Sequence, residues 1–505
     1  MFGLIAGPHG STQPVTRWLM SDQYVDQRRR KLQGLRDLGI DPYGARFGQV
    51  LPNQYVRNKV ERLRLEPGQS SDADRARAAG RIVLLRDMGR LCFVTIRDSS
   101  GDLQLGISKK AIGSDAWKAI KLLDLGDLIG AEGRLGRTKT GEITLWVDAF
   151  EVLCKALRPL PEKWHGLQDV ELRYRQRYVD LFANPDVMSV FQQRILIIET
   201  VRQWLRERNF VEVETPTLQP IYGGAAARPF TTHHNTLDID LFLRISPELY
   251  LKRLMVGGME RVFEISRNFR NEGIDTEHNP EFTMLEAYQA YGDYHDMMDL
   301  AEGVTVAAID RLGGGYQRPF GTKTIDFAPP WRRATFAELF ATHVGVDMFD
   351  HAAVRRAADQ QHIDHADMAD DLVVQALFDR HVEPNLVNPT FVLDFPTSLC
   401  PLTRRHPDDP RLALRFELYV SGVELANAYT ELNDPDVQRQ TLSQQLRGEG
   451  DETMRVMDED FLRALEYGMP PAGGIGIGID RLVMLLTNST SIRDVILFPL
   501  QRPKG

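Results

Sequence analysis

Two runs of alternating residues flank a polar turn in segment 260–291, ERVFEISRNFRNEGIDTEHNPEFTMLEAYQAY. The alternation predicts two strands, and the turn NEGIDTEHNP predicts that they form one long antiparallel hairpin. One face of this hairpin is expected to carry Glu264, Ser266, Asn268 and Arg270 on the first strand, and Phe282, Met284, Glu286 and Tyr288 on the second. Charged and amide groups beside aromatic rings make a poor core but a good floor for a polar ligand. A solvated hairpin face is the alternative that this pattern leaves open.

A second hairpin is predicted in RFELYVSGVELANAYTELNDP, residues 415–435, with its turn at Ser421-Gly422. That turn brings Glu417 and Glu424 close together, and paired carboxylates with no nearby Lys suit Mg²⁺, which takes one or two carboxylates and substrate phosphates.

Asn427, Tyr429 and Glu431 share one face of this hairpin by period two, but Glu424 has the opposite parity. A site shared by all four therefore requires a β-bulge near Ala426.

The third segment, GGIGIGIDRLVMLL at 473–486, alternates glycine with isoleucine before a helical pattern. Glycines admit the close approach of a ligand, Asp480 is predicted to cap the helix, and Arg481 in its first turn can clamp a phosphate. The segment has neither the P-loop nor the dinucleotide fingerprint. A nucleotide would thus be held by arginine, Mg²⁺ and a sheet floor.

The front of the chain has a different pattern. After a helical run from Asp22 and a Ser/Asp/Ala/Arg-rich link at 67–79, five short strand-like runs span 80–153, with an amphipathic stretch at 114–123 between the third and the fourth. This order is typical of an OB-fold barrel, which binds single-stranded nucleic acid on aromatic side chains beside a basic groove. Phe93, Gln104 and the loop RTKTGE fit that use, although the pattern alone favours core filling for Phe93.

Charge bears on the choice of partner. The 505-residue chain has a net charge of −9, which by itself argues against nucleic acid. Residues 1–155, however, hold 25 basic and 18 acidic side chains, and the rest of the chain holds 36 basic and 52 acidic ones. A basic front and an acidic rear suggest two units with different partners, although ordinary variation of surface charge explains the split equally well.

The sequence gives little sign of a membrane or an oxidising compartment. No apolar run reaches the roughly 18 residues of a membrane span, and the opening MFGLIAGPHG has no basic leader. The three cysteines, Cys92, Cys154 and Cys400, form no CxxC pair, which disfavours a disulfide framework or a zinc site. We therefore expect a cytoplasmic protein.

Four regions are expected along the chain: an N-terminal extension at 1–21, an OB-fold unit with a leading helix at 22–155, a linker at 156–186, and an α+β unit at 187–505. In the last unit, the helical stripe at 191–209 runs into the strand NFVEVETP, which ends at Pro216 and is a plausible subunit-interface element.

These segments resemble motifs 1, 2 and 3 of the class II aminoacyl-tRNA synthetases: the helix and strand ending at Pro216, FRNEG…HNPEFTMLE, and GIGIDR. From about Asp22 to Pro499 the chain resembles the bacterial-type lysyl-tRNA synthetases of subclass IIb, with PELYLKRLMVGG, RYRQRYVDL, KALRPLPEKWHGLQD and NAYTELNDP as further similar blocks. Residues 1–20 fall outside the resemblance, and Cys400 stands where the family commonly has Ser.

The resemblance implies an OB-fold barrel that binds the anticodon, joined to a catalytic domain built on an antiparallel sheet flanked by helices, with a helical insertion around 330–385. It implies activation of L-lysine with ATP, transfer to tRNA(Lys), Mg²⁺ as cofactor and a homodimer, with no membrane or DNA partner. In catalysis, Arg270 would contact the ATP α-phosphate and the lysine carboxylate, and Arg481 the γ-phosphate.

The remaining roles are also implied by the resemblance. Around ATP and the metal these are Phe282 stacked on adenine, Glu272 near the base, His278 near the outer phosphates, and Glu417 with Glu424 on Mg²⁺. Around lysine they are Gly224 (by its carbonyl) and Glu248 at the α-amino group, Asn427 at the carboxylate, and Glu286, Tyr288 and Glu431 at the ε-ammonium. In the barrel, Phe93, Gln104 and Glu142 would read anticodon bases, as proteins read unstacked loop bases.

Chemistry supports lysine as the substrate, because a buried ammonium needs anionic acceptors and the same carboxylates would repel aspartate. Two alternatives remain. One is a paralogue that lysylates a protein, against which the OB-like front unit argues. The other is a non-catalytic RNA-binding relative, which predicts losses among ligand positions that are all present here.

Overall fold

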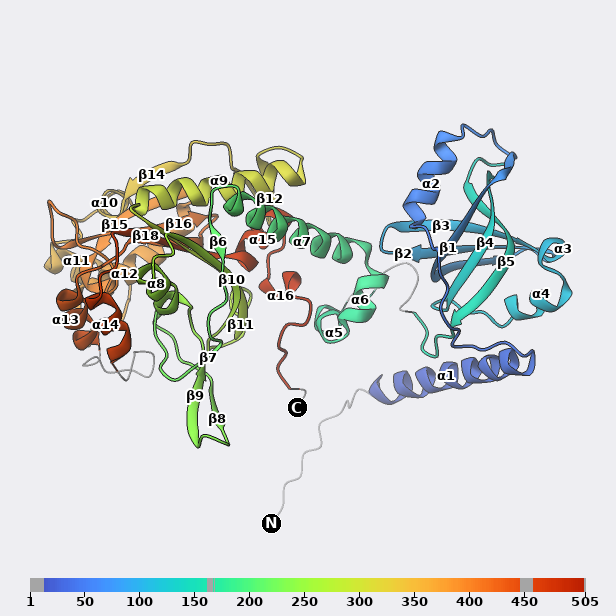
Figure 1. Ribbon diagram of the computed structural model, residues 1–505, viewed down its shortest axis with the longest axis horizontal. Coiled ribbons are helices and arrows are strands. Elements are labelled where there is room, and N and C mark those ends of the chain that lie inside the picture. The colour runs from blue at the N-terminus through green and yellow to red at the C-terminus, as the bar shows by residue number, and fades with distance from the viewer. Residues whose placement is uncertain (1–12, 161–166, 168, 446–456, 504–505) are drawn as a thin grey trace, which may run out of the picture. The chain divides into compact units, whose positions relative to one another are not determined.

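The computed structural model describes residues 13–160, 167, 169–445 and 457–503 (Figure 1). The chain divides into two compact units, Met1–Gln168 and Asp169–Gly505. The leading helix α1 (Gln13–Asp37) begins earlier than the predicted start at Asp22, so only residues 1–12 of the expected extension lie outside the description. No helix in the described ranges has the length and apolar character to cross a membrane.

A closed five-stranded barrel forms the core of the first unit, in the order β1-β2-β3-β5-β4. Its strands are β1 (Ser70–Asp87), β2 (Leu91–Asp98), β3 (Gly101–Ser108), β4 (Leu128–Arg137) and β5 (Ile143–Cys154), and its helices are α2 (Asn53–Arg62), α3 (Lys109–Ile112) and α4 (Ser114–Ile120). The predicted barrel, with helix between the third and fourth strands, is confirmed.

The predicted link at 67–79 is wrong, because β1 already begins at Ser70. Ala76 and Ala78 of this strand are buried in the barrel core, whereas Arg75 and Arg77 form ion pairs on its surface. Alanines are small enough that their alternation with arginine did not register as an apolar pattern.

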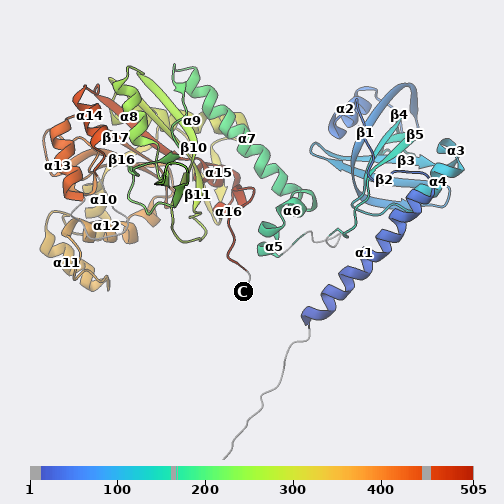
Figure 2. The ribbon, with the colours of Figure 1, turned by 60° about the horizontal axis from the view of Figure 1, so that its bottom comes forward.

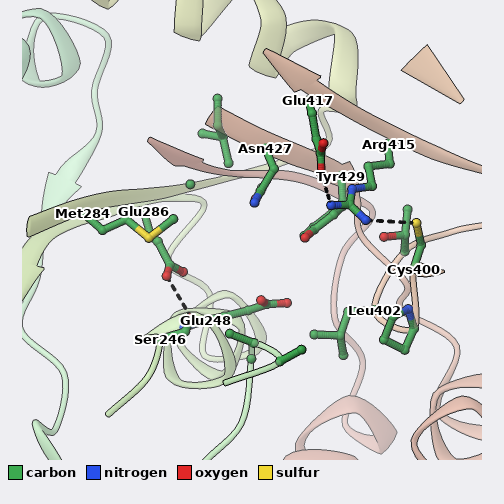
Figure 3. Close-up of a pocket in the computed structure, with 18 of the residues that line it drawn as sticks. Ser246, Glu248, Met284, Glu286, Cys400, Leu402, Arg415, Glu417, Asn427 and Tyr429 are labelled. Atoms are coloured by element: carbon green, nitrogen blue, oxygen red, sulfur yellow. Dashed lines mark hydrogen bonds and ion pairs between the residues drawn. The ribbon is translucent and has the colours of Figure 1, made fainter. Parts of the chain in front are cut away.

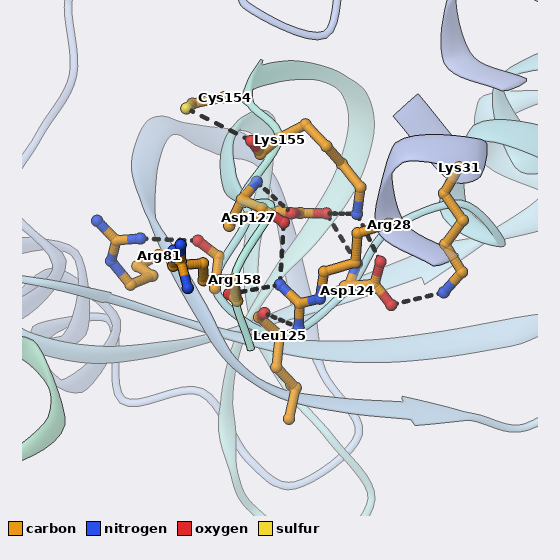
Figure 4. A network of polar contacts seen from close by, with 11 residues as sticks. Arg28, Lys31, Arg81, Asp124, Leu125, Asp127, Cys154, Lys155 and Arg158 are labelled. Atoms are coloured by element: carbon orange, nitrogen blue, oxygen red, sulfur yellow. Dashed lines mark hydrogen bonds and ion pairs between the residues drawn. The ribbon is translucent and has the colours of Figure 1, made fainter. Parts of the chain in front are cut away.

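A polar network fastens α1 to the barrel (Figure 4). Arg28 donates to the main-chain oxygens of Leu125 at 2.9 Å and Ala156 at 3.0 Å. The fully buried Lys155 ammonium lies 2.6 Å from Asp124 and 2.8 Å from Asp127. Because buried charges are tolerated only when paired and hydrogen-bonded, this network fixes the position of α1 and of the chain leaving β5.

An eight-stranded sheet runs through the second unit in the order β14-β15-β16-β17-β18-β11-β10-β6. These strands are β14 (Arg332–Thr335), β15 (Thr390–Pro396), β16 (Leu412–Val420), β17 (Val423–Thr430), β18 (Ala472–Gly478), β11 (Glu281–Ala290), β10 (Arg261–Phe269) and β6 (Val211–Glu212). All neighbours pair antiparallel except β14 with β15 and β10 with β6, which are parallel. The α+β class built on an antiparallel sheet is therefore confirmed for the central strands.

Helices cover both faces of the sheet. On one face α7 (Pro185–Arg206), α9 (Tyr294–Leu312) and α15 (Ile479–Thr487) build the largest core. On the other, α8 (Glu248–Val256) and α14 (Glu459–Glu466) pack together, with α13 (Pro435–Gln445) beside α14. The insertion expected around 330–385 is helical, with α10 (Phe336–Val344), α11 (His351–Gln360) and α12 (Asp370–His381) gathered at one end of this unit (Figure 2).

Smaller elements complete the second unit. The predicted linker at 156–186 is too long, because the unit begins at Asp169 and α5 (Val170–Arg175) and α6 (Arg177–Ala183) precede α7. A three-stranded sheet contains β7 (Leu218–Gln219), β8 (Thr231–His234) and β9 (Ile239–Leu243), and a two-stranded one contains β12 (Gln317–Phe320) and β13 (Lys323–Asp326). Short helices lie at Glu383–Asn385, Thr397–Leu399 and α16 (Ile492–Val495).

Candidate active site

The β10–β11 hairpin supplies the floor of the site. Glu264 pairs with Glu286, Ser266 with Met284, and Asn268 with Phe282. Directly paired residues of an antiparallel ladder project from the same face, so the two predicted polar faces are one surface. The predicted hairpin and the shared face of its two strands are confirmed.

The β16–β17 hairpin contributes the neighbouring carboxylates through a bulge. Its turn residues Ser421 and Gly422 have φ values of 56° and 79°, as a two-residue hairpin turn requires. Leu418 pairs with Ala426 and Tyr419 with Glu424, which leaves Leu425 as the extra residue. The predicted bulge near Ala426 is confirmed, and it turns Glu424 to the face that holds Asn427.

Strand β18 lies between β17 and β11 and lets their side chains meet above it. A Cβ atom on Gly474 would stand 2.0 Å from Glu431 Oε1 and 2.5 Å from the Tyr288 ring. The glycine is therefore what gives these two side chains their space.

Two adjoining cavities lie over this surface, and Figure 3 shows the first of them. The first has a volume of about 330 Å³, and its wall includes Gly224, Glu248, Arg270, Glu286, Tyr288, Glu417, Glu424 and Asn427. The second has a volume of about 220 Å³, and its wall includes Arg270, Glu272, His278, Phe282, Glu424 and Arg481. Arg270, Glu424 and Asn427 line both cavities. The structure thus brings the predicted lysine and ATP residues to the walls of two cavities that share wall residues, with one exception.

That exception is Glu431, which does not line either cavity. Its carboxylate is fully buried behind the wall, where Lys252 Nζ lies 2.6 Å from Glu431 Oε2 and 2.6 Å from Glu248 Oε1. Sequence reasoning missed Lys252, although its spacing of four residues from Glu248 is that of an ion pair on one helical turn.

Glu286 is the carboxyl group that faces the first cavity without an ion-pair partner in the described part of the chain. It accepts hydrogen bonds from Ser246 Oγ at 2.8 Å and Tyr288 Oη at 3.2 Å. Burial, helped by the charge of Glu248, raises the pKa of Glu286 to about 8. An ammonium placed beside it would favour the ionised form.

The prediction that no Lys lies near Glu417 and Glu424 did not consider arginine, and the structure places an arginine beside each of them. Arg415 forms an ion pair with Glu417, and Tyr419 donates to the same carboxylate. Arg481 Nη1 donates to the Glu424 carbonyl oxygen at 2.7 Å and lies 3.4 Å from its carboxylate. Although burial acts in the opposite direction, Arg481 and Arg415 hold the pKa of Glu424 below its usual value.

Few side chains near Glu417 and Glu424 could serve as metal ligands. Within the described ranges, no cluster of three or more His, Cys, Asp or Glu side chains is placed to hold a metal ion. Two carboxylates fit Mg²⁺ when a bound phosphate and water supply the other oxygens, and they fit a closed all-protein metal cage poorly.

Asp480 does not cap α15 as predicted. The N-cap position is Gly478, and no side-chain cap is present there. The Asp480 carboxylate instead accepts from the main-chain N–H of Thr283 at 2.6 Å and lies 2.5 Å from Arg194 Nη1. It ties α15 to β11 and α7, and so fixes the helix that carries Arg481.

The turn after β10 carries further residues that were predicted to bind the nucleotide. Glu272 and His278 are exposed, and His278 Nδ1 lies 2.9 Å from Asp275 Oδ2. The Arg270 guanidinium carbon lies 5.1 Å from the centre of the Phe282 ring. The Arg270 Nε is buried and has no hydrogen-bond partner among the described residues, so it is a donor left for a ligand.

Of the predicted anticodon residues, Phe93 and Glu142 reach the surface of the barrel, whereas Gln104 is buried. Phe93 is half-buried and alternates with core residues, its ring 6.2 Å from that of Trp146, so the core-filling alternative is wrong. Gln104 is held by Arg86 and Thr144, each at 2.8 Å. Glu142 is exposed beside Arg57. Sequence reasoning did not single out Trp146, although it continues the aromatic surface.

Comparisons with known proteins agree with this geometry. Residues 169–502 match the family model of tRNA synthetases class II (D, K and N), and residues 76–153 match the OB-fold nucleic acid binding domain. A lysine–tRNA ligase of Pelotomaculum thermopropionicum is 51% identical over 94% of both chains. Those of Carboxydothermus hydrogenoformans and Bacillus subtilis are 49% and 46% identical over 96% of this chain and 99% and 98% of theirs. The chain therefore belongs to the class II tRNA synthetases, within the lysine–tRNA ligase family.

Proposed function

We propose that this chain activates L-lysine with ATP and transfers the lysyl group to the 3′ end of tRNA(Lys). The observation that carries the proposal is the place of Arg270 on the wall of both cavities. A carboxylate in the first cavity and an α-phosphate in the second would meet at this guanidinium, whose planar fork of donors suits both groups.

The reaction needs no protein nucleophile. A lysine carboxylate oxygen attacks the α-phosphorus of ATP, the bond to the bridging oxygen breaks, and pyrophosphate leaves. A ribose hydroxyl of the terminal tRNA adenosine then attacks the lysyl carbonyl, and AMP leaves. The chain contributes positioning and charge neutralisation by Arg270 and Arg481, which are effective because the groups are in place before charge develops.

Lysine would lie with its two ammonium groups toward carboxylates. Glu248 and the Gly224 carbonyl are assigned to the α-amino group, Asn427 to the carboxylate, and Glu286 with Tyr288 to the ε-ammonium. Glu431 would act on that ammonium from behind the wall. For ATP, we assign Phe282 to adenine, Glu272 to the base, His278 to the outer phosphates and Arg481 to the γ-phosphate.

Glu417 and Glu424 would hold Mg²⁺ together with the ATP phosphates, and the ion would neutralise phosphate charge. Phe93, Gln104 and Glu142 would read the anticodon. The helix α7 and the following strand would form a homodimer interface; Ile195 and Val211 there are 57% and 52% exposed. Since ATP and tRNA are cytoplasmic, we place the protein there.

Lysine-dependent exchange of pyrophosphate into ATP tests activation, and charging of tRNA(Lys) tests transfer. We expect Arg270→Ala to lower the exchange rate about 10²-fold or more, as the loss of a transition-state donor does. Arg261→Ala is the matched control, because Arg261 lies at the start of the same strand, where its side chain donates to the Arg208 carbonyl oxygen at 2.8 Å and lies over the Phe210 ring. A near-normal rate for Arg270→Ala would refute its role.

The two alternatives give different results in the same assays. Exchange without charging of tRNA would favour a paralogue that lysylates a protein. The absence of exchange with any amino acid would favour a non-catalytic RNA-binding relative.

A further inference from the structure

Lys252 is a buried cation that touches two carboxylates and does not line the cavity. It lies on α8, one helical turn after Glu248, and its side chain is fully buried. Its second partner, Glu431, directly follows β17. One ammonium group thus joins a helix to the end of a sheet strand, although the two residues are separated in sequence by more than a third of the chain length.

The charges around the two cavities can be counted by pairs. Glu417 is paired with Arg415, and Glu424 with Arg481, so these four groups balance one another. At the other end of the first cavity lie three carboxylates, Glu248, Glu286 and Glu431, and among the described residues Lys252 is the one cation that forms ion pairs with any of them.

When all are ionised, this end of the cavity has a net charge of −2. Lysine brings two ammonium groups to it, and its carboxylate goes to Arg270 on the proposed function. The charge of this end of the cavity therefore equals and opposes that of the two substrate ammonium groups only if Lys252 is included. Without Lys252 the same end would have three negative charges for two ammonium groups.

We propose that Lys252 is a positioning residue that sets the charge of the lysine site at the value complementary to a diamino acid, by neutralising Glu431 and holding Glu248 in place for the α-amino group. This inference rests on the proposed function and deepens it. Since Lys252 Nζ is sequestered behind the wall, it acts through the two carboxylates and makes no contact with the substrate.

Both carboxylates raise the pKa of Lys252 above its usual value, although burial acts in the opposite direction. The ammonium is thus a permanent charge at any working pH, unlike the carboxyl group of Glu286. A permanent cation is suited to set a fixed charge balance.

The test uses three variants of the full chain: K252M, E431Q and the double variant K252M/E431Q. K252M leaves a net charge of −3, E431Q leaves −1, and the double variant restores −2. We expect K252M to raise the KM for lysine in pyrophosphate exchange by about tenfold or more, since a buried carboxylate loses its partner. The KM for ATP should change by less than about twofold, because charges in the ATP cavity are untouched.

The double variant decides between charge and structure. We expect its KM for lysine to be at least about fivefold lower than that of K252M, because it regains the wild-type charge. If Lys252 only holds the fold together, the double variant will be as impaired as K252M or more, and the proposal will be overturned. A rise of the KM for ATP equal to that for lysine would overturn it too.

Should K252M alone fail to fold, as judged by its thermal unfolding, the comparison moves to E431Q. The proposal expects the double variant to bind lysine more tightly than E431Q, and weaker binding would contradict it. Failure of the proposed function is seen separately, because the wild-type protein would then show no lysine-dependent exchange at all.

Discussion

If Glu286 receives the lysine ε-ammonium as proposed, this one residue will make lysine binding depend on pH. Its pKa is about 8 in the ligand-free protein, mainly because of burial, so most of this carboxyl group is protonated at neutral pH. A lysine ε-ammonium, with an ordinary pKa near 10.4, is charged throughout this range. On the proposed assignment, binding would require Glu286 to release a proton, and acid would oppose binding.

We expect the Kd of lysine to fall by up to about tenfold for each pH unit between pH 6 and 7.5, and to level off near pH 8. The sign follows from the raised pKa, since the ionised form that binds the cation gains population as the pH rises. Calorimetric titration of lysine at several pH values measures this. Glu286→Gln should bind weakly with little pH dependence, and a wild-type Kd that stays constant from pH 6 to 7.5 would contradict the assignment.

The same pKa predicts a stability difference in the absence of lysine. The pKa of Glu286 is about 8 in the folded protein and has its ordinary, lower value in the unfolded chain. As the pH rises between these two values, the free energy of unfolding therefore falls by up to about 1.4 kcal/mol per pH unit. Gln at this position does not ionise. The Tm of Glu286→Gln relative to wild type should therefore increase from pH 5 to pH 8, and a difference that shrinks over this range would be evidence against a buried, cation-free Glu286.

The sequence allowed us to predict which side chains share a face at the site, but not all of their ion-pair partners. Phe282, Glu286 and Asn427 follow from strand parity alone, because alternation assigns each side chain to a face. Asp480 and Glu431 were misplaced because their partners, Arg194 and Lys252, are distant in sequence. A short helix-start pattern cannot show that a carboxylate is engaged by another helix.

At the scale of elements, strand β18 controls how closely β11 and β17 side chains approach each other. A methyl group on Gly474 would lie 2.0 Å from Glu431 Oε1, and the nearby Tyr288 leaves it little room. On Gly478 of the same strand, the nearest atom would be Arg481 Cδ at 3.4 Å, an ordinary contact. The two positions thus form a matched pair.

We expect Gly474→Ala to raise the KM for lysine about tenfold or more and to lower Tm, because overpacking a filled interior costs about 1–3 kcal/mol. Gly478→Ala should keep Tm within about 2 °C of wild type, as a change of a few tenths of a kcal/mol implies. Pyrophosphate exchange and thermal unfolding of both variants measure the contrast. Equal Tm losses would show that the strand, and not the site, is sensitive.

The elements also differ in how much of them the sequence could predict. The β16–β17 bulge was predictable, because the four residues predicted to bind ligands could share a face only if the parity changed between Glu424 and Asn427. The first half of β1 was not, since alanine and arginine alternate there without a strong apolar signal. Long hairpins with polar turns are therefore easier to predict than barrel strands with small inward residues.

At the scale of the whole molecule, the two units have separate cores and opposite charge, with the basic excess in residues 1–155. Activation should need only the second unit, whereas charging should also need the barrel. Electrostatic contacts with RNA weaken with salt because bound counterions are released. Raising the salt from 50 to 200 mM should lower kcat/KM for tRNA charging about tenfold or more while leaving pyrophosphate exchange within about twofold. Equal sensitivity of both assays would contradict this division.

Phe93 allows the same division to be tested with one side chain. Its ring lies half-exposed on the outer face of β2, beside Trp146, where an unstacked base could rest. Stacking on an aromatic ring contributes about 1–3 kcal/mol per base, so Phe93→Ala should lower kcat/KM for tRNA about 5- to 150-fold. Lysine-dependent pyrophosphate exchange should be unchanged. Tyr43→Ala is the control, since this 45% exposed ring lies in the loop that meets the far end of β5. If Phe93→Ala leaves kcat/KM for tRNA unchanged, or if Tyr43→Ala lowers it equally, this face of the barrel does not recognise tRNA.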